Sequence, residues 1–292
     1  MRFSGHQTFH LREAWLYKGL TALSTDGEIF ARDDAAEKLG VGKNMAEAML
    51  YWLQACQLVR KTEGFALTPM ATSILKHDPY LELDGTILLI HYLLATNEDQ
   101  ASAWYWFFNK LGVTEFDTET LAIYLQTYAE KHGSRRLPDN TVSREINCLL
   151  ATYRRPTYEG RETPETVNPS PFARFALVEA MAGNRYRKRG IDPSRIDPCV
   201  FAYMLGIYWR EVLGKPSTVT FELVANGEKS PALALGLSEE QVAHLLDQLS
   251  KQDRAPYLNF SRTGGYAIVT LNDDAVGKAM IHYYADHKSI LV

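Results

Sequence analysis

The alternation of apolar and polar residues at the start of the chain predicts helices followed by a small hairpin. Leu11, Trp15 and Ala22 recur at helical spacing, and Thr8 is placed to cap that helix. The glycines of Gly40-Val41-Gly42 predict a break between two further helices. The predicted elements are helices over residues 9–23, 33–39 and 43–57, then strands over 58–61 and 65–68.

This order of a short helix, a glycine-containing turn, a longer helix and a hairpin is typical of a winged helix-turn-helix module. Such modules contact either DNA or protein, and we favour DNA. The start of the 43–57 helix would then enter the major groove, while the hairpin lies on the backbone. The residues predicted to contact DNA are Lys43, Asn44 and Tyr51 on the helix and Arg60 and Lys61 on the hairpin. Glu47 on the same face argues against this, because phosphates repel a carboxylate.

The middle of the chain is predicted to be helical, and it contains five consecutive aromatic residues, 104–108. Aromatic side chains can stack on unpaired bases. Consecutive residues point all round a helix, however, so we favour burial in the core over base stacking. A further helix should run from Asp139 or Thr141 to residue 153, with the apolar stripe Val142, Ile146, Leu149 and Leu150.

The end of the chain has the same predicted order of helices followed by a hairpin as its start. Helical stretches over 220–224, 230–235 and 238–250 precede a predicted hairpin over 257–261 and 266–271. Ser238 and Gln241 form a capping-box sequence at the third stretch. This second winged-helix candidate carries Glu239 and Glu240 on its last helix, and we therefore expect it to contact protein.

The fold class predicted is therefore mainly α, with winged helix-turn-helix modules at both ends of a helical, basic centre. The corresponding domains are an N-terminal winged-helix domain over 1–78, a helical basic domain over 79–212 and a winged-helix-like domain over 213–292.

The composition is that of an ordinary globular protein. Of 292 residues, 46% are hydrophobic and 23% are charged. Apolar runs are too short to span a bilayer and the N-terminus does not resemble a signal peptide, so we expect a cytoplasmic protein without a membrane partner. Cys56, Cys148 and Cys199 are widely separated, which predicts buried free thiols.

The net charge of −4 hides an uneven distribution. Residues 131–195 have a net charge of +6, while the stretches before and after have −7 and −3. A locally basic stretch is a candidate surface for DNA phosphates, although it could equally be a solvated helix surface. The cations predicted to contact DNA here are Arg154, Arg155, Arg185, Arg187, Lys188 and Arg189.

The chain contains no nucleotide-binding, serine-hydrolase or zinc-protease motif, and no spaced set of carboxylates typical of a metal-dependent nuclease. The most unusual polar cluster is at the N-terminus. There, His6 or His10 could act as a general base, with Arg12 holding a phosphate and Glu13 beside His10. Alternatively, His6 and Arg12 could tie the N-terminus to the domain through buried hydrogen bonds, which is the interpretation that we favour.

Several motifs resemble those of a known family. The opening stretch, residues 4–19 (SGHQTFHLREAWLYKG), is the most specific of them, and further landmarks follow through most of the chain. They are residues 39–45 (LGVGKNM), 78–82 (DPYLE), 104–109 (WYWFFN), 141–150 (TVSREINCLL) and 200–203 (VFAY). In these motifs the chain resembles a bacterial family of formerly unknown function that includes the B subunit of Ssp-type DNA phosphorothioation systems.

The resemblance implies a DNA-processing role in a system that places sulfur in the DNA backbone for anti-phage defence. In that family the B subunit is described as a DNA nickase, which implies Mg²⁺ or Mn²⁺ as cofactor. It also implies two partners, a sulfur-transfer protein of the phosphoadenosine-phosphosulfate-reductase type and an ATPase. The residues alone leave two alternatives open, a non-catalytic adaptor that recruits the sulfur-transfer protein to DNA and a winged-helix transcription regulator.

Overall fold

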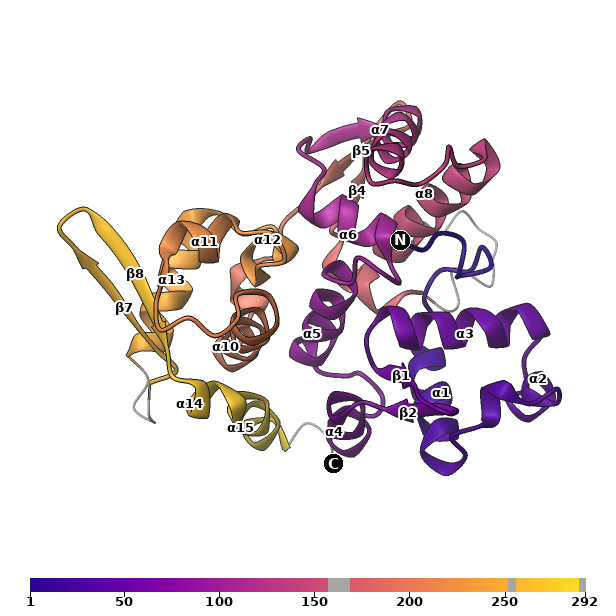
Figure 1. The fold of residues 1–292 in the computed structure, drawn as a ribbon, viewed down its shortest axis with the longest axis horizontal. Helices are drawn as coiled ribbons and strands as arrows, with labels where there is room; N and C mark the ends of the chain where they lie inside the picture. The colour runs from indigo at the N-terminus through magenta and orange to yellow at the C-terminus, as the bar shows by residue number, and fades with distance from the viewer. Residues whose placement is uncertain (157–168, 252–255, 289–292) are drawn as a thin grey trace. The chain divides into compact units, whose positions relative to one another are not determined.

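The computed structural model describes residues 1–156, 169–251 and 256–288, and this part of the chain is mainly helical with three small antiparallel sheets (Figure 1). It divides into two compact units. Unit 1 contains residues 1–81 and 93–189, and unit 2 contains residues 82–92 and those from 190 onward. This division does not follow the three consecutive stretches predicted from the sequence. No helix in the described ranges is long and apolar enough to cross a membrane.

The first part of unit 1 has the elements that its sequence predicts. Thr68 caps a helix by accepting a hydrogen bond from the Ala71 N–H, and Pro69 occupies the first helical position, where its missing N–H costs nothing. The elements are α1 (Glu13–Thr25), η1 (Ile29–Ala31), α2 (Ala35–Lys38), α3 (Lys43–Ala55), β1 (Val59–Lys61), β2 (Phe65–Leu67) and α4 (Pro69–His77).

Helix α1 begins at Glu13, four residues later than the sequence predicts. The preceding segment is irregular because Ser4, Gln7 and Thr8 all have positive φ angles, between 50° and 73°. A residue in that left-handed conformation cannot be the extended N-cap of a helix. The prediction that Thr8 caps a helix starting at residue 9 is therefore wrong.

The second part of unit 1 contains the aromatic run and the basic stretch. Residues 104–108 are buried, at most 3% exposed, which confirms the core interpretation. The apolar stripe predicted on α8 is also buried. The elements are α6 (Ser102–Asn109), β3 (Glu115–Asp117), α7 (Thr118–Lys131), α8 (Asp139–Tyr153), η2 (Pro171–Phe175), β4 (Val178–Ala180) and β5 (Arg185–Lys188), with strand order β3-β5-β4.

Unit 2 holds helix α5 (Asp84–Ala95) up to Tyr92, together with the C-terminal elements. The predicted capping box is confirmed, with both reciprocal bonds between Ser238 and Gln241 present. The elements are η3 (Pro193–Arg195), α10 (Pro198–Ile207), η4 (Tyr208–Val212), β6 (Val219–Thr220), α11 (Phe221–Asn226), α12 (Pro231–Leu235), α13 (Glu239–Ser250), β7 (Leu258–Thr263), β8 (Tyr266–Leu271), α14 (Asp273–Gly277) and α15 (Ala279–Asp286). The strand order is β6-β8-β7, so the first strand pairs with the last.

Candidate functional site

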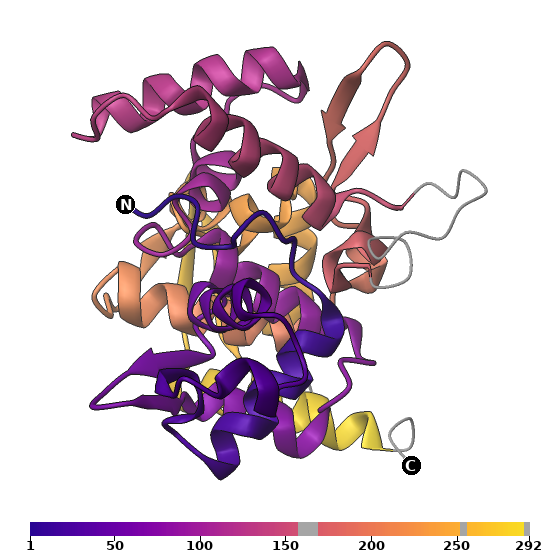
Figure 2. The same ribbon diagram turned by 90° about the vertical axis from the view of Figure 1, so that its right-hand side faces the viewer.

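The N-terminal segment, residues 1–10, lies between α3 and α8 and contacts both helices. The carbonyl oxygen of Phe9 accepts hydrogen bonds from Nε1 of Trp52 on α3 (3.1 Å) and from Sγ of Cys148 on α8 (3.3 Å). Figure 2 shows this segment as the indigo trace that runs past α8 before entering α1. We call residues 1–10 the N-terminal strap, because one carbonyl group joins two helices that are distant in the sequence.

His6 is the centre of the strap and is fully buried. Its Nε2 lies 3.0 Å from Oε1 of Glu145, and its Nδ1 accepts a hydrogen bond from the Thr8 N–H at 3.1 Å. Since Nδ1 is an acceptor, the ring proton belongs on Nε2, which donates it to the carboxylate. Both ring nitrogens are thus occupied, and this geometry supports a tethering role for His6.

Glu145 lies on the buried side of α8 and also accepts a hydrogen bond from the Ser4 N–H. An ionised carboxylate inside a protein requires such donors to offset its lost hydration. Its charge acts on the neighbouring Tyr51, whose pKa is raised mainly by burial and further by the negative charge of Glu145. Glu145 was missed in the sequence analysis, although an acid next to Ile146 on the apolar side of a helix is itself a signal of a buried partner.

Aromatic rings enclose the His6–Glu145 pair. The His6 ring centroid lies 5.8 Å from that of Trp104, 6.0 Å from that of Tyr51 and 6.3 Å from that of Trp52. Gly5 passes so close to Tyr51 that an added Cβ would lie 2.2 Å from its Cδ2 atom. The strap therefore fits closely against α3, and this contact requires glycine at position 5.

The structure gives the other predicted catalytic residues different surroundings. His10 is buried. The Arg12 guanidinium lies over the rings of Phe9 (5.6 Å) and Trp15 (4.9 Å), and its Nε is buried with no hydrogen-bond partner among the described residues. Cation–π contacts of this kind stabilise a partly buried guanidinium.

Glu13 is paired with Arg174, whose NH2 atom lies 3.1 Å from its Oε2. Burial raises the pKa of Glu13, and the positive charge of Arg174 opposes this rise. Within the described ranges, no three His, Cys, Asp or Glu side chains form a group that could hold a metal ion. His6, Arg12 and Glu13 thus have different partners, and the described residues supply no such group.

The exposed part of α3 is its first turn. Lys43 and Asn44 are exposed, and Glu47 accepts a hydrogen bond from Nε2 of Gln7 at 2.8 Å. Tyr51, which the sequence analysis places on the DNA-facing side, is only 2% exposed. Its placement on that side is wrong because the strap covers this side of α3, a contact that the helix periodicity cannot reveal.

The hairpin after α3 carries two exposed cations. Arg60 and Lys61 lie on β1, opposite Ala66 and Phe65 of β2. Neither of these cations, nor Lys43, has an ion-pair partner in the described part of the chain. The start of α3 and the hairpin thus present free positive charge within one helix–turn–helix–hairpin unit.

The cationic run on β5 is not free. The cross-strand register places Glu115 of β3 opposite Arg187, and Glu115 binds both Arg187 (2.7 Å) and Arg185 (2.8 Å). The Arg187 guanidinium holds the pKa of Glu115 below its usual value. Arg189 in turn pairs with Glu179 at 3.3 Å. The three arginines remain partly exposed, but nearby acids offset much of their charge.

Lys188 points inward from the same strand. Its Nζ donates to the carbonyl oxygen of Phe107 at 2.8 Å, near the end of α6, where helix carbonyls lack backbone partners. Burial lowers the pKa of Lys188 to about 8. The prediction that Lys188 contacts phosphate is therefore wrong for this structure, since its ammonium group caps a helix.

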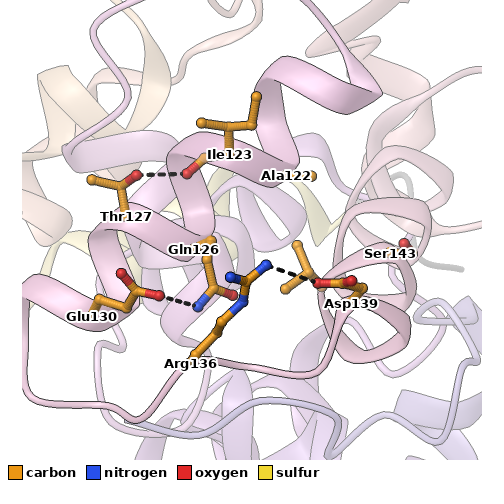
Figure 3. Close-up of a pocket in the computed structure, with 9 residues that line it drawn as sticks. Ala122, Ile123, Gln126, Thr127, Glu130, Arg136, Asp139 and Ser143 are labelled. Atoms are coloured by element: carbon orange, nitrogen blue, oxygen red, sulfur yellow. Dashed lines mark hydrogen bonds and ion pairs between the residues drawn. The ribbon is translucent and has the colours of Figure 1, made fainter.

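Helices α7 and α8, together with the loop that joins them, form a groove with a volume of about 380 Å³ (Figure 3). Arg136 lies over it, 3.7 Å from Asp139, with both side chains more than three-quarters exposed. At the other end of α8, Arg154 is half-buried and Arg155 is exposed. Arg136 and Arg155 therefore face solvent to a greater degree than Lys188 does.

Comparison with known proteins identifies a family and two solved structures with a similar fold. A family model described as "Protein of unknown function (DUF4007)" matches residues 3–284. A solved structure described as "SspB crystal structure" has a similar fold, with a TM-score of 0.85 and 22% identity. A second, "Magnesium ion-bound SspB crystal structure", has a TM-score of 0.86 at the same identity. Each match covers 98% of this chain and 89% of the other chain. No curated protein matches the chain.

Proposed function

Because this chain belongs to the DUF4007 family of proteins of unknown function, and its motifs resemble the B subunit of Ssp-type systems, we propose that it is a DNA-binding subunit of a DNA phosphorothioation system. The observation that carries this proposal is the positive charge of Lys43, Arg60 and Lys61, which have no ion-pair partner among the described residues, on the unit formed by α2, α3, β1 and β2. Cations without acidic partners release counterions from DNA when they bind phosphates.

In this proposal the unit binds DNA as a winged helix. The first turn of α3 enters the major groove with Lys43 and Asn44, and the hairpin carries Arg60 and Lys61 to the backbone. Asn44 is suited to a bidentate contact with adenine. Glu47 is held by Gln7 of the strap, which offsets some of its repulsion toward phosphate.

The family resemblance adds nicking of DNA to this proposal, with Mg²⁺ or Mn²⁺ as cofactor. The described residues do not fit a resident metal ion, since they contain no group of three suitable ligands. A metal-dependent nick would therefore need further ligands, such as phosphate oxygens of the DNA itself.

A second candidate function is a non-catalytic adaptor that brings a sulfur-transfer protein of the phosphoadenosine-phosphosulfate-reductase type to DNA, beside a partner ATPase. The observation that favours it is the occupation of both ring nitrogens of the buried His6. A general base needs a nitrogen within reach of the proton that it removes. In this structure His6 offers none.

The test of DNA binding is fluorescence anisotropy with a labelled duplex over a range of salt concentrations. We expect the variant Lys43→Ala and the double variant Arg60→Ala/Lys61→Ala to bind DNA more weakly. The slope of the logarithm of the binding constant against the logarithm of the salt concentration should become less steep by about one for each phosphate-binding cation that is removed. The matched control is Lys278→Ala, an exposed lysine in unit 2. Equal affinity of all variants, or no binding by the wild type, would contradict the proposal.

The test of nicking is the conversion of supercoiled plasmid to open circles with and without Mg²⁺ or Mn²⁺. Nicking that persists in His6→Ala would assign catalysis to other residues. Nicking that is abolished in His6→Ala, in protein whose folding is verified by circular dichroism, would contradict the adaptor function. Binding without nicking, alone and with the sulfur-transfer protein and ATPase, would support it.

A further inference from the structure

Helix α8 has one exposed face, and beyond Asp139, the first residue of the helix, that face carries no acidic residue. Positions 140, 143, 144, 147, 151 and 154 are each three or four residues from another member of the set, so they form one stripe along the helix. The stripe is made of Asn140, Ser143, Arg144, Asn147, Ala151 and Arg154. The acids of α8 are Asp139 at its first position, 3.7 Å from Arg136, and Glu145, which faces the core and binds His6.

The cations of this stripe have no ion-pair partner among the described residues, in contrast to those of β5. Arg144 is exposed and has no ion-pair partner among the described residues. Arg135 and Arg155, which flank the helix, are exposed and likewise free within those ranges. Arg136 lies 3.7 Å from Asp139, but both are so exposed that their attraction is weak. Positive charge therefore flanks both ends of α8 and occurs once near its middle.

The side chains between the arginines are amides and a hydroxyl, which donate hydrogen bonds to phosphate oxygens without regard to base sequence. From position 140 to position 154 the helix extends for about 21 Å. At an axial rise of about 3.4 Å for each phosphate of one strand, this length corresponds to about six base pairs measured along the duplex axis. The stripe thus has the charge and the donors of a surface that contacts DNA phosphates.

We propose that this stripe of α8 binds the phosphate backbone of DNA, as a second contact surface beside the start of α3 and the β1–β2 hairpin. The inference rests on the proposed DNA-binding function. The residues assigned to this second surface are Asn140, Ser143, Arg144 and Asn147. The strap holds the two surfaces in a fixed relation, since the Phe9 carbonyl binds Trp52 of α3 and Cys148 of α8. A preformed pair of surfaces loses less conformational entropy on binding than two independent ones.

The proposal is tested with two substitutions on the stripe, Arg144→Ala and Asn147→Asp. The second preserves the shape of the side chain and places a negative charge in the centre of the surface. The matched controls in unit 2 are Lys278→Ala and Asn259→Asp, both at exposed positions. Binding of the full chain to a labelled 20-base-pair duplex is measured between 50 and 200 mM salt, and circular dichroism verifies folding.

We expect both stripe variants to bind more weakly than wild type and both controls to bind as wild type does. For Arg144→Ala the difference from wild type should shrink by about threefold between 50 and 200 mM salt, because one phosphate contact contributes a slope of about 0.9. Wild-type affinity in both stripe variants, together with weakened binding by Lys43→Ala, would overturn this inference and leave the proposed function intact. Absence of DNA binding by the wild type would overturn both. Tighter binding of double-stranded RNA, weakened by the same variants, would overturn the assignment to DNA.

Discussion

The imidazole of His6 donates its Nε2 proton to Oε1 of Glu145 over 3.0 Å, and both side chains are buried 139 positions apart in the sequence. This bond fastens the N-terminal strap to α8, while the Thr8 N–H fixes the other ring nitrogen. The strap covers α3 at Tyr51, so the same contact that orders the N-terminus also limits which part of α3 faces solvent. The first turn of α3 remains exposed at Lys43 and Asn44.

The His6–Glu145 pair should contribute strongly to stability. Replacing His6 by alanine leaves a buried carboxylate short of a donor, and we expect the free energy of unfolding to fall by about 3 kcal/mol. Glu145→Gln preserves the shape and should cost less. Urea denaturation of both single variants and of the double variant gives the coupling energy, expected at about 1–3 kcal/mol. Additive effects of the two substitutions would contradict a direct interaction.

Gly5→Ala should destabilise the strap. The new Cβ would collide with the Tyr51 ring, which His6 and Trp52 hold from other sides, and overpacking of this kind costs about 1–3 kcal/mol. Gly112→Ala is the matched control, because no atom lies within 4 Å of its added Cβ. The midpoint of thermal unfolding should fall for the first variant and stay within error for the second. Equal midpoints would show that the Tyr51 contact is loose.

Tyr51→Phe should leave DNA binding unchanged, because the side chain lies beneath the strap. Anisotropy titrations of this variant should overlay those of the wild type under conditions where Lys43→Ala binds more weakly. A drop in affinity in Tyr51→Phe, without a drop in stability, would mean that the strap leaves α3 when DNA binds and that the sequence-based assignment of Tyr51 holds in the complex.

Lys188 should make the free energy of unfolding depend on pH. Its pKa is lowered to about 8 in the folded state, so between about pH 8 and pH 10.5 the unfolded chain holds a proton that the folded chain has released. The contribution of Lys188 to the free energy of unfolding therefore rises with pH between about pH 8 and pH 10.5. The three buried thiols act in the opposite direction, since their pKa values are raised on folding.

The measurement for Lys188 is accordingly the difference in unfolding free energy between wild type and Lys188→Met from pH 7 to pH 9.5. The methionine variant preserves the apolar contact with Phe107 and Phe108 and lacks the titrating group. Relative to this variant, the wild type should gain stability as the pH rises above 8. If the difference in unfolding free energy between wild type and Lys188→Met did not change with pH, the ammonium group of Lys188 would be hydrated in the folded protein.

The cysteines should resist alkylation in the native state. Burial raises the pKa of the Cys56 and Cys148 thiols, and it raises that of Cys199 to about 11. At pH 8 the reactive thiolate is therefore scarce at all three positions. Iodoacetamide labelling followed by mass spectrometry should find three modified thiols in denaturant and almost none without it. Rapid native labelling at Cys148 would indicate that the strap opens, because its Sγ is bonded to the Phe9 carbonyl.

Much of the secondary structure could be predicted because its signals are local. Helix periodicity, the proline and threonine at the start of α4 and the Ser238–Gln241 capping box act over a few residues, and the structure has each of them. The buried stripe of α8 follows from the same periodicity. Mainly helical architecture, with small hairpins at both ends of the chain, was therefore determined by the sequence itself.

The candidate site depended on contacts that local patterns do not encode. A run of arginines on β5 has the same sequence whether or not Glu115 lies opposite Arg187, and the register of β3 against β5 decides that Glu115 pairs with Arg185 and Arg187. Tyr51 lies on the polar side of a helical wheel, but the strap buries it. Ion pairs and strand registers between distant segments depend on tertiary packing, and so only the tertiary structure decided which cations of this basic segment are paired with acids.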